Sequence, residues 1–437
     1  MVNDGGSKFF IEPSRKVPIA REVDVVVVGG GMAGSCAGIA AGRMGLKTLL
    51  VEYFGYLGGN ATNGSINTFC GFYTFQKNAV QLVKGIGGEI VQTLVGRKGA
   101  RVEETGEVAF DPEMLKLVLD EKMAEAKVEL LYYTQMVAVV IEEDSIKGVI
   151  VENKGGRQAI LAKVVLDCTG DGDVCALANV PFELGDGNGG FEACDMGFRV
   201  ANVGEHFKHD IGKFAGLIDE ALKSGRYKLT RTGFCILGYT MMPGAWWANM
   251  ARIPWVVSGI DPHHLTQGTI EGRKIVREFL RFMVDKLPGF ERAGVIQTGE
   301  KLGVRETRRV LGEHLLTEEE ILKGTKFDDG IGTSAWPVEV HTAEGKSKFE
   351  FLKGDDFHTI PYRSLVPKKV ENLLMAGRFI SCTHMAQASI RVMGPASVMG
   401  QAIGTAAALS IKGEMIPRKL NIKLLQRELK TAGVFLE

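Results

Sequence analysis

The sequence contains no closely spaced pair of cysteines. None of its seven cysteines forms a Cys-x-x-Cys or Cys-x4-Cys pair. A structural zinc ion or an iron–sulfur cluster needs tighter ligand spacing than this, so we expect no metal site. Thiols without partners are typical of reducing compartments, and we therefore expect a cytoplasmic protein. The cysteines are Cys36, Cys70, Cys168, Cys175, Cys194, Cys235 and Cys382.

Long apolar runs and an excess of charge of one sign are also missing. No run reaches the roughly 18 apolar residues that cross a bilayer, so we expect no membrane partner. The charged residues within 1–20 argue against a signal peptide. Basic and acidic residues number 52 each, which argues against a general attraction to nucleic acid. We expect a small-molecule substrate as the partner, and a homo-oligomer stays open.

Glycine, by contrast, is abundant, with 56 glycines against 13 prolines. The first glycine cluster follows the valine-rich run at residues 23–28, which predicts a strand buried on both faces, as in a parallel sheet. The chain then passes through the glycine cluster into a helix expected over residues 32–44. Residues 47–51 predict the next strand, which ends at Glu52.

This strand–turn–helix–strand unit is typical of a dinucleotide site. Gly29, Gly31 and Gly34 would let backbone N–H groups and the helix N-terminus approach a pyrophosphate. Glu52 would accept hydrogen bonds from ribose hydroxyls and would repel a 2′-phosphate. A glycine-rich turn with an incidental glutamate is the structural alternative.

The rest of the chain predicts an α/β fold, with a Rossmann-like domain, a β-meander and an inserted α+β substrate domain. The dinucleotide-binding domain is expected over residues 18–181 and 357–437, and the inserted domain over 182–356. Expected strands are 137–141, 146–151 and 158–162, which form the meander, and 164–167 and 372–376. Expected helices are 87–95, 266–286, 395–411 and 422–430, with further helices starting after Asp111 and Thr317.

Several segments together resemble the FAD-dependent oxidoreductases with two dinucleotide-binding domains, the architecture of the glutathione reductase and fumarate reductase flavoproteins. More narrowly, the chain resembles the bacterial FAD-dependent oxidoreductase family. The segments that carry the broader resemblance are 23–34, the meander, Asp167-Cys168-Thr169-Gly170-Asp171 and Leu374-Met375-Ala376-Gly377-Arg378. Those that carry the narrower one are 302–309, 360–365 and 389–394.

The resemblance implies FAD as the cofactor. No second Gly-x-Gly-x-x-Gly follows a strand in the middle of the chain, so a separate NAD(P)H domain is not expected. Relatives that attach the flavin covalently use a histidine near the glycine loop, whereas the first histidine here is His206, so we expect noncovalent FAD. Arg378 stands where many relatives have aspartate. The expected FAD-binding residues are Gly29, Gly31, Met32, Ala33, Gly34, Glu52, Gly59, Asn60, Thr169, Gly170, Asp171, Gly377, Arg378, Arg391 and Gly394.

For the chemistry we expect hydride transfer between a small polar substrate and flavin N5. His384 would move the proton, and Arg305 would hold a substrate carboxylate or enolate-like oxygen. Tyr362 would face the flavin from the other side, and one of the clustered tryptophans of the inserted domain could line the pocket. The structural alternatives are a satisfied histidine, a surface salt-bridge set for Arg305, and a core tyrosine with a bonded hydroxyl.

Two other functions stay open. The glycine loop and Glu52 also occur in NAD-binding enzymes of the thiazole-synthase type. A flavin-binding protein without turnover, such as a sensor or assembly factor, would share the FAD-binding residues. Bond type, direction of reaction and electron acceptor are open as well.

Overall fold

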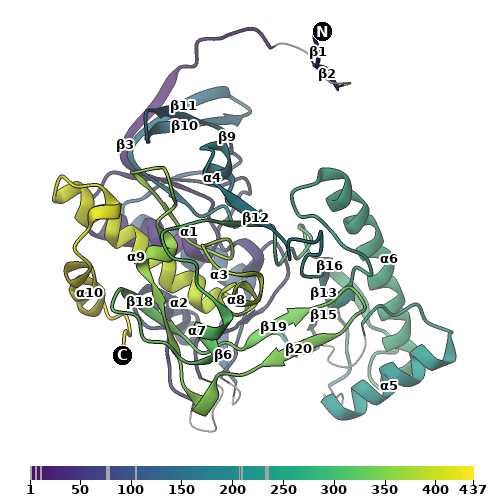
Figure 1. The fold of residues 1–437 in the computed structure, drawn as a ribbon. Helices are drawn as coiled ribbons and strands as arrows, with labels where there is room; N and C mark the ends of the chain where they lie inside the picture. The colour runs from purple at the N-terminus through teal and green to yellow at the C-terminus, as the bar shows by residue number, and fades with distance from the viewer. Residues whose placement is uncertain are drawn as a thin grey trace.

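A seven-stranded sheet lies at the centre of the larger of the two lobes (Figure 1). The computed structural model describes all residues except 1, 5–6, 10–11, 75–78, 104–105, 206, 208–209 and 232–235. The strand order is β8 (Glu129–Leu131), β4 (Thr48–Val51), β3 (Ile19–Val28), β11 (Gly156–Asp167), β10 (Ser145–Asn153) and β9 (Gln135–Glu142), and β22 (Leu373–Met375) also pairs with β11. The predicted α/β class is confirmed.

The valine run predicted as a doubly buried strand forms the second half of β3. Val25, Val26 and Val27 are fully buried, and β3 pairs in parallel with β4 on one side and β11 on the other. Such a central parallel strand has no solvated face, which is why apolar residues follow one another without alternation.

Strand β11 differs from its prediction. Residues 158–162 and 164–167 were expected as two strands, but they belong to one strand of 12 residues. Its first half pairs antiparallel with β10, and its second half pairs in parallel with β22. No turn-forming residue separates Ala162 from Val164, so the chain continues straight from the meander into the parallel sheet.

Helices α1 (Met32–Arg43) and α9 (Met393–Lys412) pack against each other at backbone distance. A Cβ atom at Gly400 would overlap the carbonyl oxygen of Ala33, and one at Gly404 would overlap that of Ala37. Larger side chains would push the helices apart, so the small residues of α9 are required by this contact.

The three glycines on one face of α1 have different neighbours. A Cβ at Gly34 would overlap the carbonyl oxygen of Gly29, so this residue lies against the strand–helix turn. Gly38 instead faces Met123 of α3 (Pro112–Glu125), and Gly42 lies against the carbonyl of Ala126. The far half of α1 therefore packs on α3 and the residue that follows it, and at Gly38 also on Leu50 of β4.

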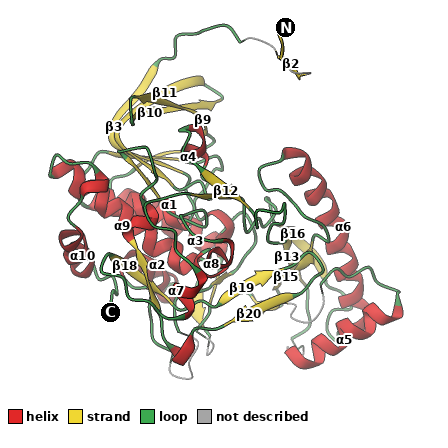
Figure 2. Cartoon of the chain, in the orientation of Figure 1, coloured by secondary structure: helices red, strands yellow, loops and turns green. Residues whose placement is uncertain are grey.

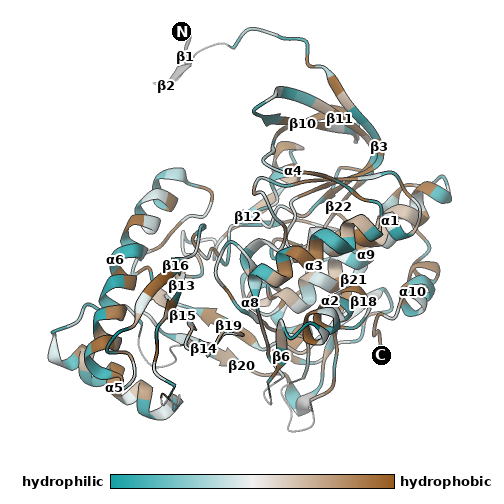
Figure 3. Cartoon of the chain, turned by 180° about the vertical axis from the view of Figure 1, so that it is seen from behind, coloured by the Kyte–Doolittle hydropathy of each residue, from teal (hydrophilic) through white to brown (hydrophobic). Residues whose placement is uncertain are grey.

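The smaller lobe has its own apolar core, formed by residues between Cys194 and Val304. A four-stranded antiparallel sheet, in the order β14 (Ile236–Tyr239), β15 (Trp246–Arg252), β13 (Asp195–Ala201) and β16 (Gly294–Thr298), lies under α5 (Ile211–Ser224) and α6 (Pro262–Lys286). Figure 2 shows the two helices on the outer side of this lobe, and Figure 3 shows hydrophilic and hydrophobic stretches alternating along them. Val310 and the later apolar residues of the predicted insertion, such as Ile331 and Val338, pack in the core of the larger lobe.

Helix starts follow their capping residues. Asp111 accepts hydrogen bonds from the backbone of Glu113 and caps α3, and Thr317 forms the predicted capping box with Glu320. Helix α6 begins at Pro262, earlier than the predicted 266, because Asp261 caps it and proline suits the first helical position.

The remaining elements surround the two cores, and the hairpin of β19 and β20 reaches toward the smaller lobe in Figure 1. The helices are α2 (Gly85–Gly96), α4 (Asp173–Leu177), α7 (Glu318–Leu322), α8 (His384–Ile390) and α10 (Ile422–Thr431). The strands are β1 (Val2–Asp4), β2 (Ser7–Phe9), β5 (Thr68–Phe69), β6 (Ala100–Val102), β7 (Val108–Phe110), β12 (Phe182–Leu184), β17 (Arg308–Val310), β18 (Gly330–Ser334), β19 (Val338–His341), β20 (Ser347–Glu350) and β21 (His358–Pro361). Short 3-10 turns cover Gly59–Ala61, Lys353–Asp355, Tyr362–Leu365 and Pro417–Lys419.

Within the described part of the chain, no single helix is both long and apolar enough to cross a bilayer. Helices α8 and α9 reach that length and composition only as a pair, and they are bent by 90° where they meet.

The contact between α1 and α9 yields a stability prediction. Gly400→Ala should lower the free energy of unfolding by about 1–3 kcal/mol, because the added methyl group forces the two backbones apart. Gly216→Ala is the matched control, since it lies in the interior of α5 with open space around the new methyl group. There the free energy of unfolding should be unchanged or rise by up to about 1 kcal/mol. Denaturant unfolding in excess FAD measures the free energy of unfolding of both variants. If Gly400→Ala and Gly216→Ala change it by the same amount, α1 and α9 are not packed at backbone distance.

Candidate active site

The turn between β3 and α1 has the geometry of an anion-binding turn. Gly29 has a φ of +97°, which favours glycine. Gly31 is the N-cap of α1, with no side-chain hydrogen bond and no acidic residue in the first turn of the helix. The first N–H groups of α1 therefore point out of the helix with their partial positive charge available to a phosphate.

Glu52 stands beside this turn at the end of β4. Its Oε2 accepts a hydrogen bond from the backbone N–H of Gly30 at 2.6 Å, and its Oε1 accepts one from Phe54 at 2.9 Å. Burial raises the pKa of this carboxyl, and the two N–H groups oppose the rise. Glu52 thus holds the glycine turn in place as well as presenting a carboxylate next to it.

The loop after β4 folds onto the same turn. The N–H of Gly58 donates to the carbonyl of Gly30 at 2.8 Å, and Gly31 forms a parallel bridge with Gly58. A Cβ at Gly59 would lie 2.9 Å from the Cα of Gly31. Gly59 and Asn60 therefore lie next to the glycine turn, together with the other residues predicted to bind the phosphates.

The ends of β11 and β22 meet on the other side of this turn. Buried Asp167 accepts hydrogen bonds from the N–H and hydroxyl of Thr169, at 3.1 and 2.7 Å, and so shapes the Thr169–Gly170 turn. Gly170 and Gly377 both have positive φ, at +80° and +131°. Since a Cβ at Gly170 would come within 2.6 Å of Arg378, the two turns are in contact.

Arg378 is engaged with a protein carboxylate. Its Nη2 donates to Oδ1 of Asp171 at 2.5 Å, and Oδ1 also accepts from the hydroxyl of Thr307 at 2.9 Å. Burial alone would raise the pKa of Asp171, but the positive charges of Arg378 and Lys301 outweigh it and lower that pKa. The two residues expected to bind FAD separately therefore form one neutralised pair.

The start of α9 packs on the loop after β5. The N–H of Gly394 donates to the carbonyl of Cys70 at 3.0 Å, and a Cβ at Gly394 would overlap Gly71. Arg391, between α8 and α9, lies 3.3 Å from Glu192 and 3.5 Å from Glu339. Its expected contact with FAD stays a prediction.

His384 is the first residue of α8, and it contacts a carboxylate. Its Nδ1 lies 2.8 Å from Oε1 of Glu306, and the side chain is 23% exposed. Glu306 is fully buried and also accepts from Arg309 at 2.7 Å and from the backbone of Glu192 at 3.1 Å. The hydrogen bond with Glu306 raises the pKa of His384 more than burial lowers it.

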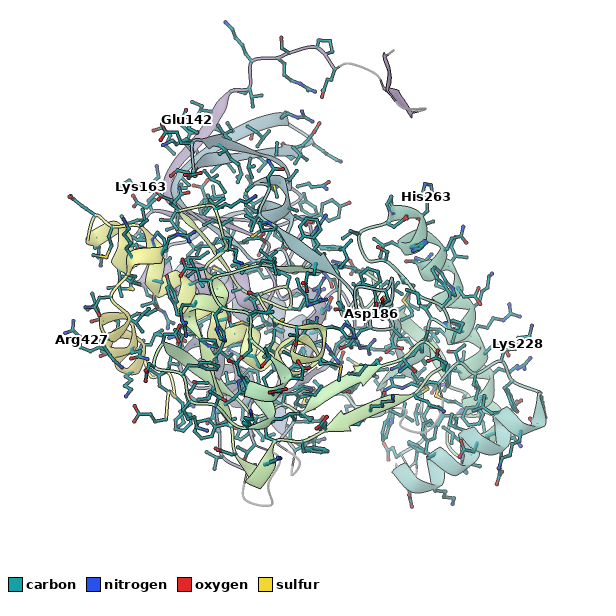
Figure 4. The ribbon with its side chains drawn as sticks, viewed as in Figure 1. Glu142, Lys163, Asp186, Lys228, His263 and Arg427 are labelled. Atoms are coloured by element: carbon teal, nitrogen blue, oxygen red, sulfur yellow. The ribbon has the colours of Figure 1, made fainter. Side chains whose placement is uncertain are left out.

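An open cavity of about 510 Å³ adjoins this group. Arg309 lines it and pairs with Glu306, and Asp186, which also lines it, interacts electrostatically with His384. Figure 4 shows Asp186 between the two lobes. The lining residues are Phe182, Glu183, Leu184, Asp186, Gly187 and Arg309.

Arg305 is not available to hold a substrate carboxylate. Its guanidinium donates to Oδ2 of Asp195 and to the carbonyl of Ala193, and its side chain is 10% exposed. Burial would raise the pKa of Asp195, but Arg305 and Arg252 together hold it far below its ordinary value. The expected substrate contact is therefore corrected to a buried ion pair, and the surface salt-bridge alternative with Glu306 and Glu313 does not hold either.

Tyr362 was expected to face the flavin, but the structure places it in the core of the larger lobe. Its side chain is 2% exposed and its hydroxyl donates to the carbonyl of Pro417 at 3.0 Å. This corresponds to the core alternative, in which a buried tyrosine hydroxyl finds a backbone acceptor.

Glu306 and Asp195 are the partners that sequence reasoning did not assign to His384 and Arg305. Glu306 directly follows Arg305 in the chain, but nothing local indicates which cation it meets. Across the described residues, no group of three or more His, Cys, Asp or Glu side chains is arranged to hold a metal ion. Six of the cysteines are free, and Cys235 lies outside the described residues.

The uncapped helix, the glycine contacts and the carboxylate at the strand end fit a dinucleotide with a pyrophosphate and a ribose diol. The fold and this site together define a dinucleotide-binding flavoprotein of the Rossmann type. Residues 24–429 match the profile of the family described as FAD dependent oxidoreductase. The chain belongs to this family, and its cofactor is FAD.

Individual relatives are more distant. Thiamine thiazole synthase from Methanococcus aeolicus is 30% identical over 174 residues, covering 38% of this chain and 62% of that protein, less than two thirds of its length. A geranylgeranyl bacteriochlorophyll reductase-like protein from Thermoplasma acidophilum has 12% identity and a TM-score of 0.46, covering 94% of this chain and 83% of its own. The p-nitrophenol 4-monooxygenase from Pseudomonas putida has 10% identity and a TM-score of 0.47, covering 93% and 84%.

The position of Glu52 predicts a loss of FAD binding. Glu52→Ala should weaken FAD binding by about 1–3 kcal/mol, because a charged hydrogen-bond acceptor is removed from the ribose and from the glycine turn. Titration of FAD into the flavin-free protein measures the change. Glu22→Ala, exposed on β3, is the control and should bind FAD normally. Unchanged binding by Glu52→Ala would show that the carboxylate contacts no part of the cofactor.

Proposed function

We propose that this FAD-dependent enzyme transfers hydride between a small polar substrate and N5 of noncovalently held FAD. The bound flavin supplies the redox chemistry, whereas the protein positions the substrate and moves the proton. The observation that carries the proposal is the partly exposed imidazole of His384, which is held by the buried carboxylate of Glu306.

The geometry supports a proton-transfer role for Nε2 of His384. Nδ1 contacts Glu306, which fixes the orientation of the ring and favours the proton on Nδ1. No hydrogen bond engages Nε2 among the residues that the structure describes, so this atom is the one that would accept a proton as a substrate carbon loses hydride. Glu306 is itself held by Arg309 and by the backbone of Glu192, so the imidazole has a rigid support.

Two alternatives belong beside this proposal. A reaction of the thiazole-synthase type is favoured by the 30% identity over 174 residues. A flavin-binding protein without turnover would keep the cofactor site and lack a substrate. Anaerobic bleaching of the flavin by candidate substrates separates turnover from binding. A cytoplasmic location and a homo-oligomeric state remain proposals as well.

The native protein should be yellow, and acid or heat should release intact FAD. The absorption spectrum of the purified protein, with chromatography of the released nucleotide, measures this. A colourless protein that releases NAD would favour the thiazole-synthase alternative, and flavin that stays on the denatured chain would contradict noncovalent binding.

His384→Ala should slow flavin reduction by roughly 10²- to 10⁴-fold if His384 is a general base. The base must be neutral, so the wild-type rate of substrate oxidation should rise with pH through the raised pKa of His384. Glu306→Gln removes the charge that raises this pKa, so the rise should move to lower pH. Stopped-flow reduction across pH measures both effects.

His263→Ala, on the exposed start of α6, is the control and should leave the rate and the pH profile unchanged. If Glu306→Gln retains FAD but keeps the wild-type pH midpoint, His384 is not the titrating group.

A further inference from the structure

The sheet of the smaller lobe has one face on its own core and the other toward the larger lobe. Met196, Phe198 and Val200 of β13 lie in the core of the smaller lobe. The alternating residues Gly197 and Arg199 therefore point the other way. A Cβ at Gly197 would lie 2.5 Å from the carbonyl oxygen of Gly64, so this face meets the loop after β4, which folds onto the glycine turn.

Arg199 lies in a row that crosses the whole sheet. It is opposite Trp247 of β15 and Gln297 of β16, and Trp247 is opposite Gly238 of β14. Opposite residues in antiparallel strands share a face, with Cβ atoms about 5 Å apart. Because Gly238 has no side chain, the row presents an indole, a guanidinium and an amide side by side.

The charge of Arg199 is not balanced by an ion pair. Among the described residues, no carboxylate lies within ion-pair distance of its guanidinium, and Asp111 and Glu113 act on it only at longer range. Within the described part of the chain, its guanidinium donates from Nη2 to Oδ1 of Asn67, at 3.2 Å. Burial accordingly lowers the pKa of Arg199.

Other arginines between the lobes are each paired with a carboxylate. Arg305 and Arg252 contact Asp195, Arg391 contacts Glu192 and Glu339, Arg309 contacts Glu306, and Arg378 contacts Asp171. An unpaired cation in the same region is costly unless a ligand supplies the missing charge.

The loop opposite Arg199 adds buried polar atoms without partners. Oδ1 of Asn63, Oγ of Ser65 and Nδ2 of Asn67 have no hydrogen bond within the described chain, and neither has Nε of Arg199. The three loop side chains are 5%, 0% and 1% exposed. Buried polar groups are normally bonded, so several unmet donors and acceptors in one place indicate a site that a polar ligand completes.

We propose that Arg199 and Asn67, with Trp247 beside them, bind the anionic group of the substrate, and that this substrate is a small organic carboxylate. The inference rests on the proposed function and identifies its substrate class. A single guanidinium matches one negative charge, and its planar fork suits a carboxylate. The loop from Gly58 to Asn67 connects the glycine turn to this row, which brings the carboxylate site next to the FAD-binding lobe.

The test uses carboxylates and their uncharged counterparts. Acetate, succinate and benzoate, with acetamide, succinamide and benzamide as matched neutral probes, are titrated into the holoprotein and the flavin-free protein. Tryptophan fluorescence and, in the holoprotein, flavin absorbance report binding. At least one carboxylate should bind, with its amide about 10-fold weaker or more.

Arg199→Gln should weaken binding of that carboxylate by about 10- to 100-fold and leave its amide unchanged. Arg199→Lys should recover part of the loss, because lysine keeps the charge without the fork. Arg277→Gln, exposed on α6 of the same lobe, is the matched control and should bind as the wild type does. Retained FAD and an unchanged circular dichroism spectrum verify that the variants fold.

Three results would overturn the inference: no carboxylate binds, Arg199→Gln binds carboxylates as the wild type does, or inorganic phosphate binds more tightly than every carboxylate through Arg199. Failure of the proposed function is a separate outcome. If carboxylates bind to the flavin-free protein in a way that requires Arg199, while no oxidisable carboxylate such as succinate or a 2-hydroxy acid bleaches the flavin of the holoprotein without oxygen, the anion site is supported and hydride transfer is contradicted.

Discussion

The fold depends on two close backbone contacts of helix α1, one with the turn that precedes it and one with helix α9. At its N-terminal end Gly34 touches the carbonyl of Gly29, and along its length Ala33 and Ala37 meet the glycines of α9. This contact leaves no room for side chains, so it sets the distance between the first and last parts of the chain. It also places the open N-terminus of α1 at the ends of β4, β11 and β22, where the dinucleotide residues gather. Two segments more than 300 residues apart in the sequence thus form one binding site.

A second constraint is the set of buried ion pairs between the lobes. Asp195 comes from the smaller lobe and Arg391 and His384 from the end of the chain, while Glu306 lies between them in sequence. Breaking one such pair would leave a buried charge uncompensated, so each pair restricts how the lobes meet. The network also explains the roles of the cations. Arg305 forms a structural ion pair with Asp195, His384 is held by Glu306, and no carboxylate among the described residues pairs with Arg199.

The two proposed sites have different physical origins. The dinucleotide site is mainly backbone, made of glycine contacts and helix N–H groups, with the carboxylate of Glu52 beside the glycine turn. The proposed substrate site is mainly side chains, contributed by the sheet of the smaller lobe and by the loop that ends at Asn67. The cofactor site thus depends on how the backbone folds, whereas the proposed substrate site depends on which side chains stand at a few positions.

Much of the fold and of the dinucleotide site could be predicted, because the relevant signals are local. The valine run, the glycine spacing, the capping residues Asp111 and Thr317 and the meander each depend on neighbours in the chain. The substrate side could not be predicted in the same way. Nothing in the residues around Arg305 and Arg199 indicates which of the two has a carboxylate partner. The tertiary structure brings Asp195 to Arg305, and no described carboxylate lies within ion-pair distance of Arg199. The core position of Tyr362 could not be predicted either, because the carbonyl of Pro417 that accepts its hydroxyl hydrogen bond belongs to a distant segment of the chain. Local patterns were enough to predict most of the central sheet, the family and FAD, whereas the pairing of buried charges depends on long-range contacts that bring residues from separate segments within hydrogen-bond distance.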